Sequence, residues 1–168
     1  MPEKETVERA RRAKRQGKAP STQAGEFVRE EMHHIREGKH GARSTKQATA
    51  IGLSKARRAG VTLRRPPRGA KAKTKQSAAY ASRAGRRGAR RPAATRSRAI
   101  RRALSREPRG AASRKSLARQ ARNVARRRSA TSRRAAAQKA VRTKGPAARS
   151  AAARQAGRTR ARRRGAPA

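Results

Sequence analysis

The amino-acid sequence predicts a mostly α-helical protein, with a small N-terminal three-helix module and an Ala/Arg-rich tail that is largely disordered or conditionally helical. Apolar residues make up 33% of the chain, but most are alanines, and Phe27 and Tyr80 are the only aromatic residues. Charge is divided unevenly: residues 1–37 contain seven of the eight glutamates, whereas residues 38–168 contain 42 of the 51 lysines and arginines. A segment with so little bulky apolar surface cannot offset the entropy lost on ordering.

The first two predicted helices lie in the charge-balanced segment. One covers roughly residues 3–16, with glutamates in its opening turns and basic residues near its end, an order that complements the helix dipole. Gly17 and Pro20 are expected to end it. The next covers residues 21–37 and carries an apolar stripe at helical spacing. The stripe consists of Ala24, Phe27, Val28, Met32 and Ile35.

The third predicted helix, residues 44–60, has the clearest start signal. Ser44 and Gln47 form a capping box, and Gly60 is typical of a left-handed helix terminator. Apolar residues on and just after the three helices predict a core, which is marginal for a module of residues 1–65. Its predicted members are Val7, Phe27, Val28, Met32, Ile35, Ile51, Leu53, Val61 and Leu63.

Pro66 and Pro67 mark the end of this module. Residues 66–92 are expected to form a basic flexible linker, and residues 93–168 a low-complexity nucleic-acid-binding tail. The tail contains windows that are compatible with helix, because alanine and arginine both favour it, although crowded like charges oppose it. The windows are residues 95–106, 113–128, 132–144 and 147–163.

The formal charge of +43 predicts a polyanionic partner. Duplex DNA carries about one negative charge per 1.7 Å, so full neutralisation would cover on the order of 20 base pairs. The absence of cysteine excludes disulfides, thiolate metal sites and cysteine nucleophiles. No secretory signal is visible, and the longest apolar run, residues 48–53, is too short to span a bilayer. We therefore expect a cytoplasmic protein without integral membrane association.

Candidate phosphate contacts lie at both ends of the third predicted helix. Backbone N–H groups at its start favour a phosphate oxygen, and we expect Arg43, Ser44, Thr45 and Lys46 to add side-chain contacts. Ser44 could instead only cap the helix, and the two roles are compatible. Near the helix exit lies a basic patch that lacks the opposite charges of an ordinary solvated face. The patch comprises Lys55, Arg57, Arg58, Arg64 and Arg65.

Runs of arginine after the module are the strongest signal for nucleic-acid binding, because they suit phosphate contact without base reading. Proteins that bind single strands usually add aromatic residues for base stacking, and Tyr80 alone does not supply them. Duplex DNA is therefore favoured, with structured RNA as an open alternative. The candidate residues are Arg86, Arg87, Arg90, Arg91, Arg126, Arg127, Arg128, Arg162, Arg163 and Arg164.

The sequence predicts no catalytic or metal-binding set. His33, His34 and His40 are interpreted as surface residues, because adjacent histidines point in different directions and no spaced cysteine or aspartate completes a ligand set. Glu30 and Glu31 are neighbours on a helix, so they do not face each other and are expected to pair with arginines at the surface. We expect no cofactor, no metal, no small-molecule substrate and no enzymatic activity.

Residues 1–63 contain four distinctive stretches: PEKET (2–6), STQAGEFVREE (21–31), GKHGARSTKQA (38–48) and IGLSKARRAGV (51–61). They resemble a family of small basic bacterial proteins with an uncharacterised domain, some of which are labelled plasmid stabilisation or DNA-binding proteins. The resemblance implies DNA binding and brings no catalytic residues. The tail resembles the tails of bacterial histone H1-like proteins in composition.

These observations lead to one main hypothesis, a non-enzymatic, mainly sequence-nonspecific DNA-binding protein that is nucleoid- or plasmid-associated. In this hypothesis the helical module orients the chain, and the tail neutralises phosphate in histone-like compaction or stabilisation. The alternative is an RNA-binding or ribosome-associated basic accessory protein. Competition between duplex DNA and structured RNA of equal length distinguishes the two.

Overall fold

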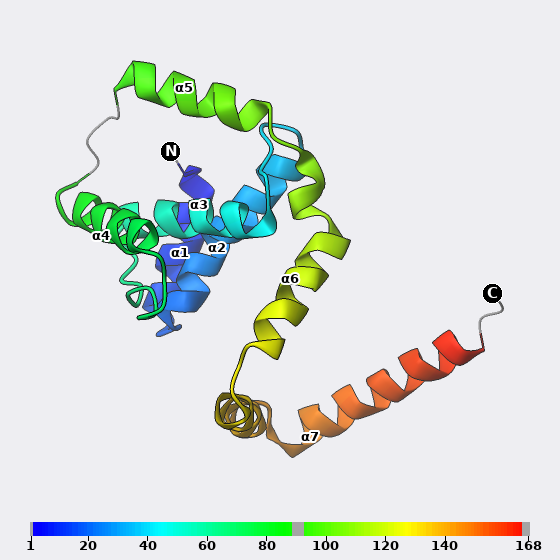
Figure 1. The fold of residues 1–168 in the computed structure, drawn as a ribbon. Helices are drawn as coiled ribbons and strands as arrows, with labels where there is room; N and C mark the ends of the chain where they lie inside the picture. Colours follow the sequence, from blue (N-terminus) through cyan, green and yellow to red (C-terminus); the bar gives the residue numbers. More distant parts are fainter. Residues whose placement is uncertain (1, 89–92, 166–168) are drawn as a thin grey trace. The chain divides into compact units, whose positions relative to one another are not determined.

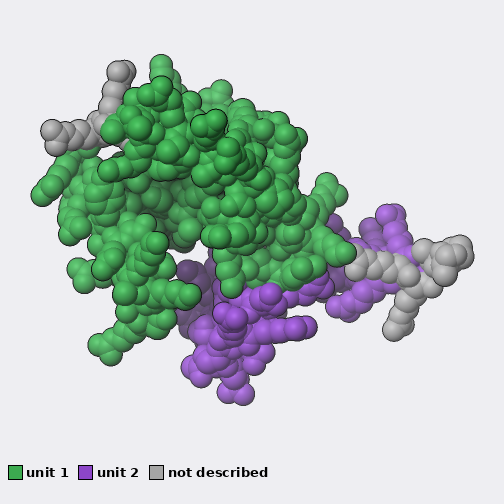
Figure 2. Space-filling model, turned by 45° about the horizontal axis from the view of Figure 1, so that its top comes forward, with its two compact units in different colours: residues 1–121 green, residues 122–168 purple. Residues whose placement is uncertain are grey.

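The computed structural model describes residues 2–88 and 93–165, and within these ranges every regular element is a helix (Figure 1). The chain divides into two compact units, residues 1–121 and residues 122–168, which Figure 2 colours separately. The helices are α1 (Lys4–Arg15), α2 (Pro20–Arg36), α3 (Thr45–Arg58), α4 (Ala72–Arg86), α5 (Ala94–Ser105), the short 3-10 helix η1 (Arg109–Ala112), α6 (Arg114–Arg126) and α7 (Ala130–Arg164). No helix of the described ranges combines the length and apolar character that a membrane crossing requires.

Local signals set the ends of the first three helices. Gly17 and Gly60 follow α1 and α3 with positive φ angles of 66° and 87°, a conformation that glycine adopts without steric cost. The Ser44 hydroxyl oxygen accepts a hydrogen bond from the Gln47 N–H at 3.2 Å, as the capping box predicts. Pro20 was expected to end the first helix, but it is instead the first residue of α2, where its missing N–H costs nothing.

Helix α2 is the centre of the first unit and packs against both α1 and α3. The apolar stripe predicted on this helix faces the core, and Phe27 and Ile35 have no exposed surface. Phe27 belongs to one cluster, together with Ala10, Ala24 and Ala56. The other cluster contains Met32, Ile35, Ala42, Ala48, Ala111 and Ala112.

The structure does not show α1–α3 as a separate module, because two later segments complete their packing. The segment around η1 lies against the loop before α3: the Thr45 hydroxyl donates to the Ala111 carbonyl at 2.7 Å. The N–H of Ala42 also donates to the Pro108 carbonyl at 3.0 Å. Residues 66–92, predicted as a flexible linker, contain α4, which packs on α3 and buries Ala78 and Ala81.

The prediction of a largely disordered tail is wrong for the described residues, which form α5, η1, α6 and α7 (Figure 1). Alanine and arginine have high helix propensities, and in this chain that preference outweighs the repulsion between like charges. Gly145 interrupts α7 with φ 66° and ψ 172°, and Pro146 follows it. This kink separates the two windows that the sequence predicted as residues 132–144 and 147–163.

Candidate nucleic-acid interface

The basic side chains that the structure describes in the second unit are exposed to solvent. Residues 122–168 contain 16 lysines and arginines and no acidic residue. Among the side chains described between residues 122 and 165, none is buried, and Val124 and Val141 are exposed large apolar residues. A helix without an apolar face is not held by a core. The described cations of α7 are therefore accessible to an external polyanion.

The arginine runs predicted in the tail lie on these solvent-exposed segments. Arg126 ends α6, Arg127 and Arg128 follow it, and Arg162 lies near the end of α7; all four are exposed. Arg163 and Arg164 belong to the last turn of α7. Outside the second unit, Arg86 and Arg87 are exposed at the end of α4, and Arg90 and Arg91 lie outside the described residues.

The start of α3 exposes three of the predicted phosphate contacts, Arg43, Ser44 and Lys46. Ser44 caps the helix through its oxygen, and its O–H remains a donor. Thr45 does not contribute as predicted, because its side chain is buried and its hydroxyl donates to the Ala111 carbonyl. This end of α3 therefore offers two cations and one hydroxyl group.

The exit of α3 keeps only part of the basic patch predicted there. Arg58, Arg64 and Arg65 are exposed. Arg57 is half-buried, donates to the Arg64 carbonyl at 3.4 Å, and has a pKa lowered by burial. Lys55 does not belong to the surface patch, because its side chain is 19% exposed and points into a cluster of carboxylates.

Glu30 and Glu31 converge on Lys55, which contradicts the predicted pairing with arginines at the surface. The side chains of both glutamates are 1% exposed. The Lys55 ammonium donates to Glu30 Oε1 at 3.0 Å and lies 2.7 Å from Glu31 Oε2 as an ion pair. Neighbouring side chains on a helix diverge, but the long lysine stem on the facing helix reaches a point between them. The charges of Glu30, Glu31 and Lys55 therefore pair with one another inside the protein, and Lys55 is not available to phosphate.

Burial and charge pairing shift the pKa values of Glu30 and Lys55 in opposite directions, and the effect of pairing is the larger. Burial alone would raise the pKa of Glu30, but hydrogen bonds from Lys55 and Thr6 and the charge of Lys55 hold it below its ordinary value of 4.5. Burial alone would lower the pKa of Lys55, but its contacts with Glu31 and Glu30 raise it above its ordinary value of 10.5. All of the charge on this lysine is therefore matched inside the protein.

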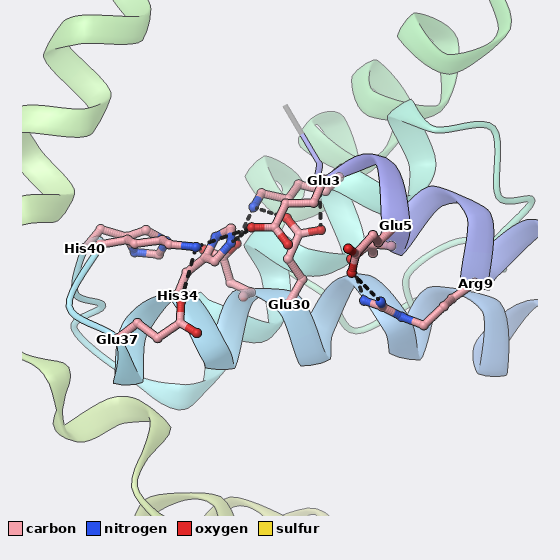
Figure 3. A network of polar contacts seen from close by, with 11 residues as sticks. Glu3, Glu5, Arg9, Glu30, His34, Glu37 and His40 are labelled. Atoms are coloured by element: carbon pink, nitrogen blue, oxygen red, sulfur yellow. Dashed lines mark hydrogen bonds and ion pairs between the residues drawn. The ribbon is translucent and has the colours of Figure 1, made fainter.

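A second group of charges continues this cluster toward the start of the chain (Figure 3). Glu3 Oε1 lies 2.8 Å from His34 Nε2 and 3.3 Å from the Lys39 ammonium, while the Glu3 N–H donates to Glu30 at 3.2 Å. The hydrogen bonds with His34 and Lys39 hold the pKa of Glu3 below its ordinary value. Contacts with Glu37 and Glu3 raise the pKa of Lys39.

The three histidines do not share one environment, although all were interpreted as surface residues. His33 is exposed, whereas the side chains of His34 and His40 are only 13% and 16% exposed. His40 Nε2 lies 3.2 Å from Glu31 Oε1. One ligand atom each from Glu31, His34 and His40 can be chosen so that all lie within 4.8 Å of one another. This group was not predicted from the sequence, although the spacing Glu-x-x-His on α2 could have indicated it.

Comparisons with known proteins assign neither a family nor a function to the chain. No family model matches the chain, and neither the curated proteins nor the solved structures contain a significant match. The resemblance of residues 1–63 to small basic bacterial proteins therefore stays an expectation.

Proposed function

We propose that this protein is a non-enzymatic DNA-binding protein that neutralises duplex phosphate with little sequence preference, as a nucleoid- or plasmid-associated factor. The observation that carries the proposal is the second unit, in which 16 basic residues occur without one acidic residue and none of the described side chains is buried. Each cation that contacts phosphate releases a condensed counterion, and this release drives binding. Residues 1–65 act in the proposal as the part that orients the chain.

The scarcity of aromatic residues favours a duplex over a single strand. Phe27 is completely buried, which leaves Tyr80, 57% exposed on α4, as the one aromatic ring of the sequence available to stack on a base. Base stacking contributes about 1–3 kcal/mol per base in proteins that bind single strands. A protein with a single exposed tyrosine for stacking binds mainly through its charge, which suits the dense phosphate of a duplex.

Neutralising four cations in each of two helices of the full-length chain tests the proposal. The tail variant replaces Arg133, Arg134, Lys139 and Arg142 of α7 by glutamine, and the control replaces Arg11, Arg12, Lys14 and Arg15 of α1, so that both lose the same charge. All eight side chains are exposed. The slope of log K against log salt concentration is negative, and we expect it to become shallower in the tail variant by up to about 3 to 4, at about 0.9 per phosphate contact.

The control is expected to change that slope much less, because residues 1–37 carry seven glutamates that already balance most of their cations. Mobility-shift titrations at several salt concentrations supply the slopes. An equal change in salt slope for the two variants would contradict the proposal that the second unit carries most of the phosphate contacts. Equal or tighter binding of structured RNA than of duplex DNA of the same length would favour an RNA-binding accessory protein instead.

A further inference from the structure

We propose that Glu31, His34 and His40 form a binding site for a transition-metal ion of the zinc class, which links the end of α2 to the loop before α3. None of its three residues is among the proposed phosphate contacts. Its three side chains come from two turns of α2 and from the segment that follows it, and each is mostly shielded from solvent. Two imidazoles and one carboxylate are a donor set that zinc prefers over magnesium or calcium.

The hydrogen bond of His40 shows which of its nitrogens can bind a metal. Its Nδ1 lies 3.0 Å from the Gly41 carbonyl oxygen. Because a carbonyl oxygen can only accept, Nδ1 carries a proton. When the ring is neutral, Nε2 therefore carries the lone pair. A backbone carbonyl that fixes one ring nitrogen in this way is the usual support of a metal-bound histidine.

The lone pair of His40 Nε2 faces another acceptor, Glu31 Oε1, at 3.2 Å. The Glu31 carboxylate is buried, and neither of its oxygens has a partner with hydrogen-bond geometry. Lys55 lies beside Oε2, which leaves Oε1 as the oxygen directed at the imidazole. In this neutral form the two facing acceptors repel. Either a proton on Nε2 or a metal ion bound to both atoms removes the repulsion, and we assign the metal ion.

His34 completes the group, and Glu3 supports it from outside. The contact of 2.8 Å between His34 Nε2 and Glu3 Oε1 is a carboxylate–histidine pair of the kind that orients metal ligands (Figure 3). When Nε2 donates to Glu3, the other ring nitrogen keeps the lone pair. Adjacent ligands of tetrahedral zinc lie about 3.4 Å apart, given Zn–N lengths of about 2.0–2.1 Å. Metal binding therefore requires the three ligand atoms, which lie within 4.8 Å of one another, to close to this spacing.

Local charge favours a cation here despite the charge of the whole chain. Four carboxylates lie around the site, from Glu3, Glu30, Glu31 and Glu37. The nearby cations are the ammonium groups of Lys39 and Lys55 and the guanidinium of Arg109, which lies against Gly38. Salt screens exposed charges that lie more than about 8–10 Å from the site. The charged groups nearest the site therefore decide the local potential.

Zinc chloride titration of the untagged, full-length chain in the absence of nucleic acid tests the proposal. The protein is first freed of metal with a chelator, and affinity is measured by competition with a chromogenic zinc chelator. Native chain is expected to bind one zinc ion and to unfold at a higher temperature with zinc than without it. His34→Gln, His40→Gln and Glu31→Gln are each expected to weaken binding by more than about 100-fold, beyond the loss typical of an outer-shell change.

His33→Gln is the matched control, because this adjacent histidine on α2 is exposed and lies outside the site. It is expected to keep the native affinity and the native thermal shift. The two histidine variants keep the buried Glu31–Lys55 pair, so circular dichroism can verify that they fold. Absence of zinc binding by the native chain would overturn the proposal, and so would equal binding by the His40→Gln and His33→Gln variants. DNA binding is not part of this test, so a metal site and the proposed function can fail independently.

Discussion

A basic side chain can bind phosphate only when its charge is not already matched within the fold. Lys55 and Lys46 lie on the same helix and look equivalent in sequence, yet Lys46 is exposed and Lys55 contacts two buried carboxylates. The positive charge of Lys55 therefore stabilises the packing of α2 on α3. Lys46 remains available at the start of α3.

Replacing Lys55 by methionine is expected to destabilise the protein by about 3–5 kcal/mol at neutral pH, because it leaves Glu30 and Glu31 buried without their cation. Lys46→Met, on the exposed side of α3, is expected to stay within about 0.5 kcal/mol of the native stability. Urea denaturation of the three proteins measures both effects. At temperatures where all three are folded, Lys46→Met is expected to weaken DNA binding and Lys55→Met to leave it unchanged.

The cost of Lys55→Met is expected to shrink as the pH falls from neutral toward the ordinary glutamate pKa of 4.5. In the native chain the pKa of Glu30 is lowered, so the stability it contributes is present above this value and is lost below it. In the variant the main lowering contact is gone and burial raises the pKa, so the penalty is relieved as the carboxyl takes up a proton. A difference in stability that does not depend on pH would contradict a role for charge pairing.

At the scale of helices, the contact between α2 and α3 depends on the absence of a side chain at Gly52. A methyl group there would lie 2.7 Å from Val28 Cα and 3.0 Å from the Phe27 carbonyl oxygen, both on the facing helix. Neither is the flexible end of a side chain, so the helices would have to move apart. A glycine inside a helix otherwise costs stability, which indicates that close approach is its purpose.

Gly52→Ala is therefore expected to destabilise the protein by about 1–3 kcal/mol through overpacking. Gly25→Ala is the matched control in α2, because a methyl group at this exposed position meets no atom within 4 Å. It is expected to stabilise the protein by up to about 1 kcal/mol through helix propensity. Chemical denaturation compares the two. A gain in stability for both variants would show that α2 and α3 do not pack closely at Gly52.

Local signals in the sequence were sufficient for the first three helices, because caps, glycines and apolar spacing act within a few residues, but α4 was predicted as a flexible linker. The cap at Ser44, the terminator at Gly60 and the break at Gly145 all agree with prediction. The contacts of η1 were not predictable in this way, since Ala111 and Ala112 are buried but look like any other alanines of the tail. The cluster around Lys55 was missed because its pairing joins residues 25 positions apart.

At the scale of the whole molecule, the predicted end of the folded part at residue 65 and the observed limit of the first unit at residue 121 lead to different expectations. Ala111 and Ala112 belong to the cluster of Met32 and Ile35, and the Ala111 carbonyl accepts the bond from the buried Thr45 hydroxyl. A chain that ends at residue 65 loses these contacts, whereas one that ends at residue 121 keeps them. The second shortened chain also lacks 16 of the 51 basic residues.

We expect the chain of residues 1–121 to unfold at nearly the same temperature as the first unit of the complete protein, and the chain of residues 1–65 to unfold at a clearly lower one. Loss of residues 66–121 removes the hydrogen bond of Thr45, at a net cost of about 0.5–1.5 kcal/mol, and exposes the apolar cluster of Met32 and Ile35 to water. The 1–121 chain is expected to bind DNA more weakly and with a shallower salt dependence than the complete protein, because fewer counterions are released. Thermal denaturation and salt-dependent titration measure the two properties separately. Equal unfolding temperatures for the two shortened chains would show that residues 66–121 do not stabilise the core. An unchanged salt slope for the chain of residues 1–121 would show that the second unit does not carry the phosphate contacts.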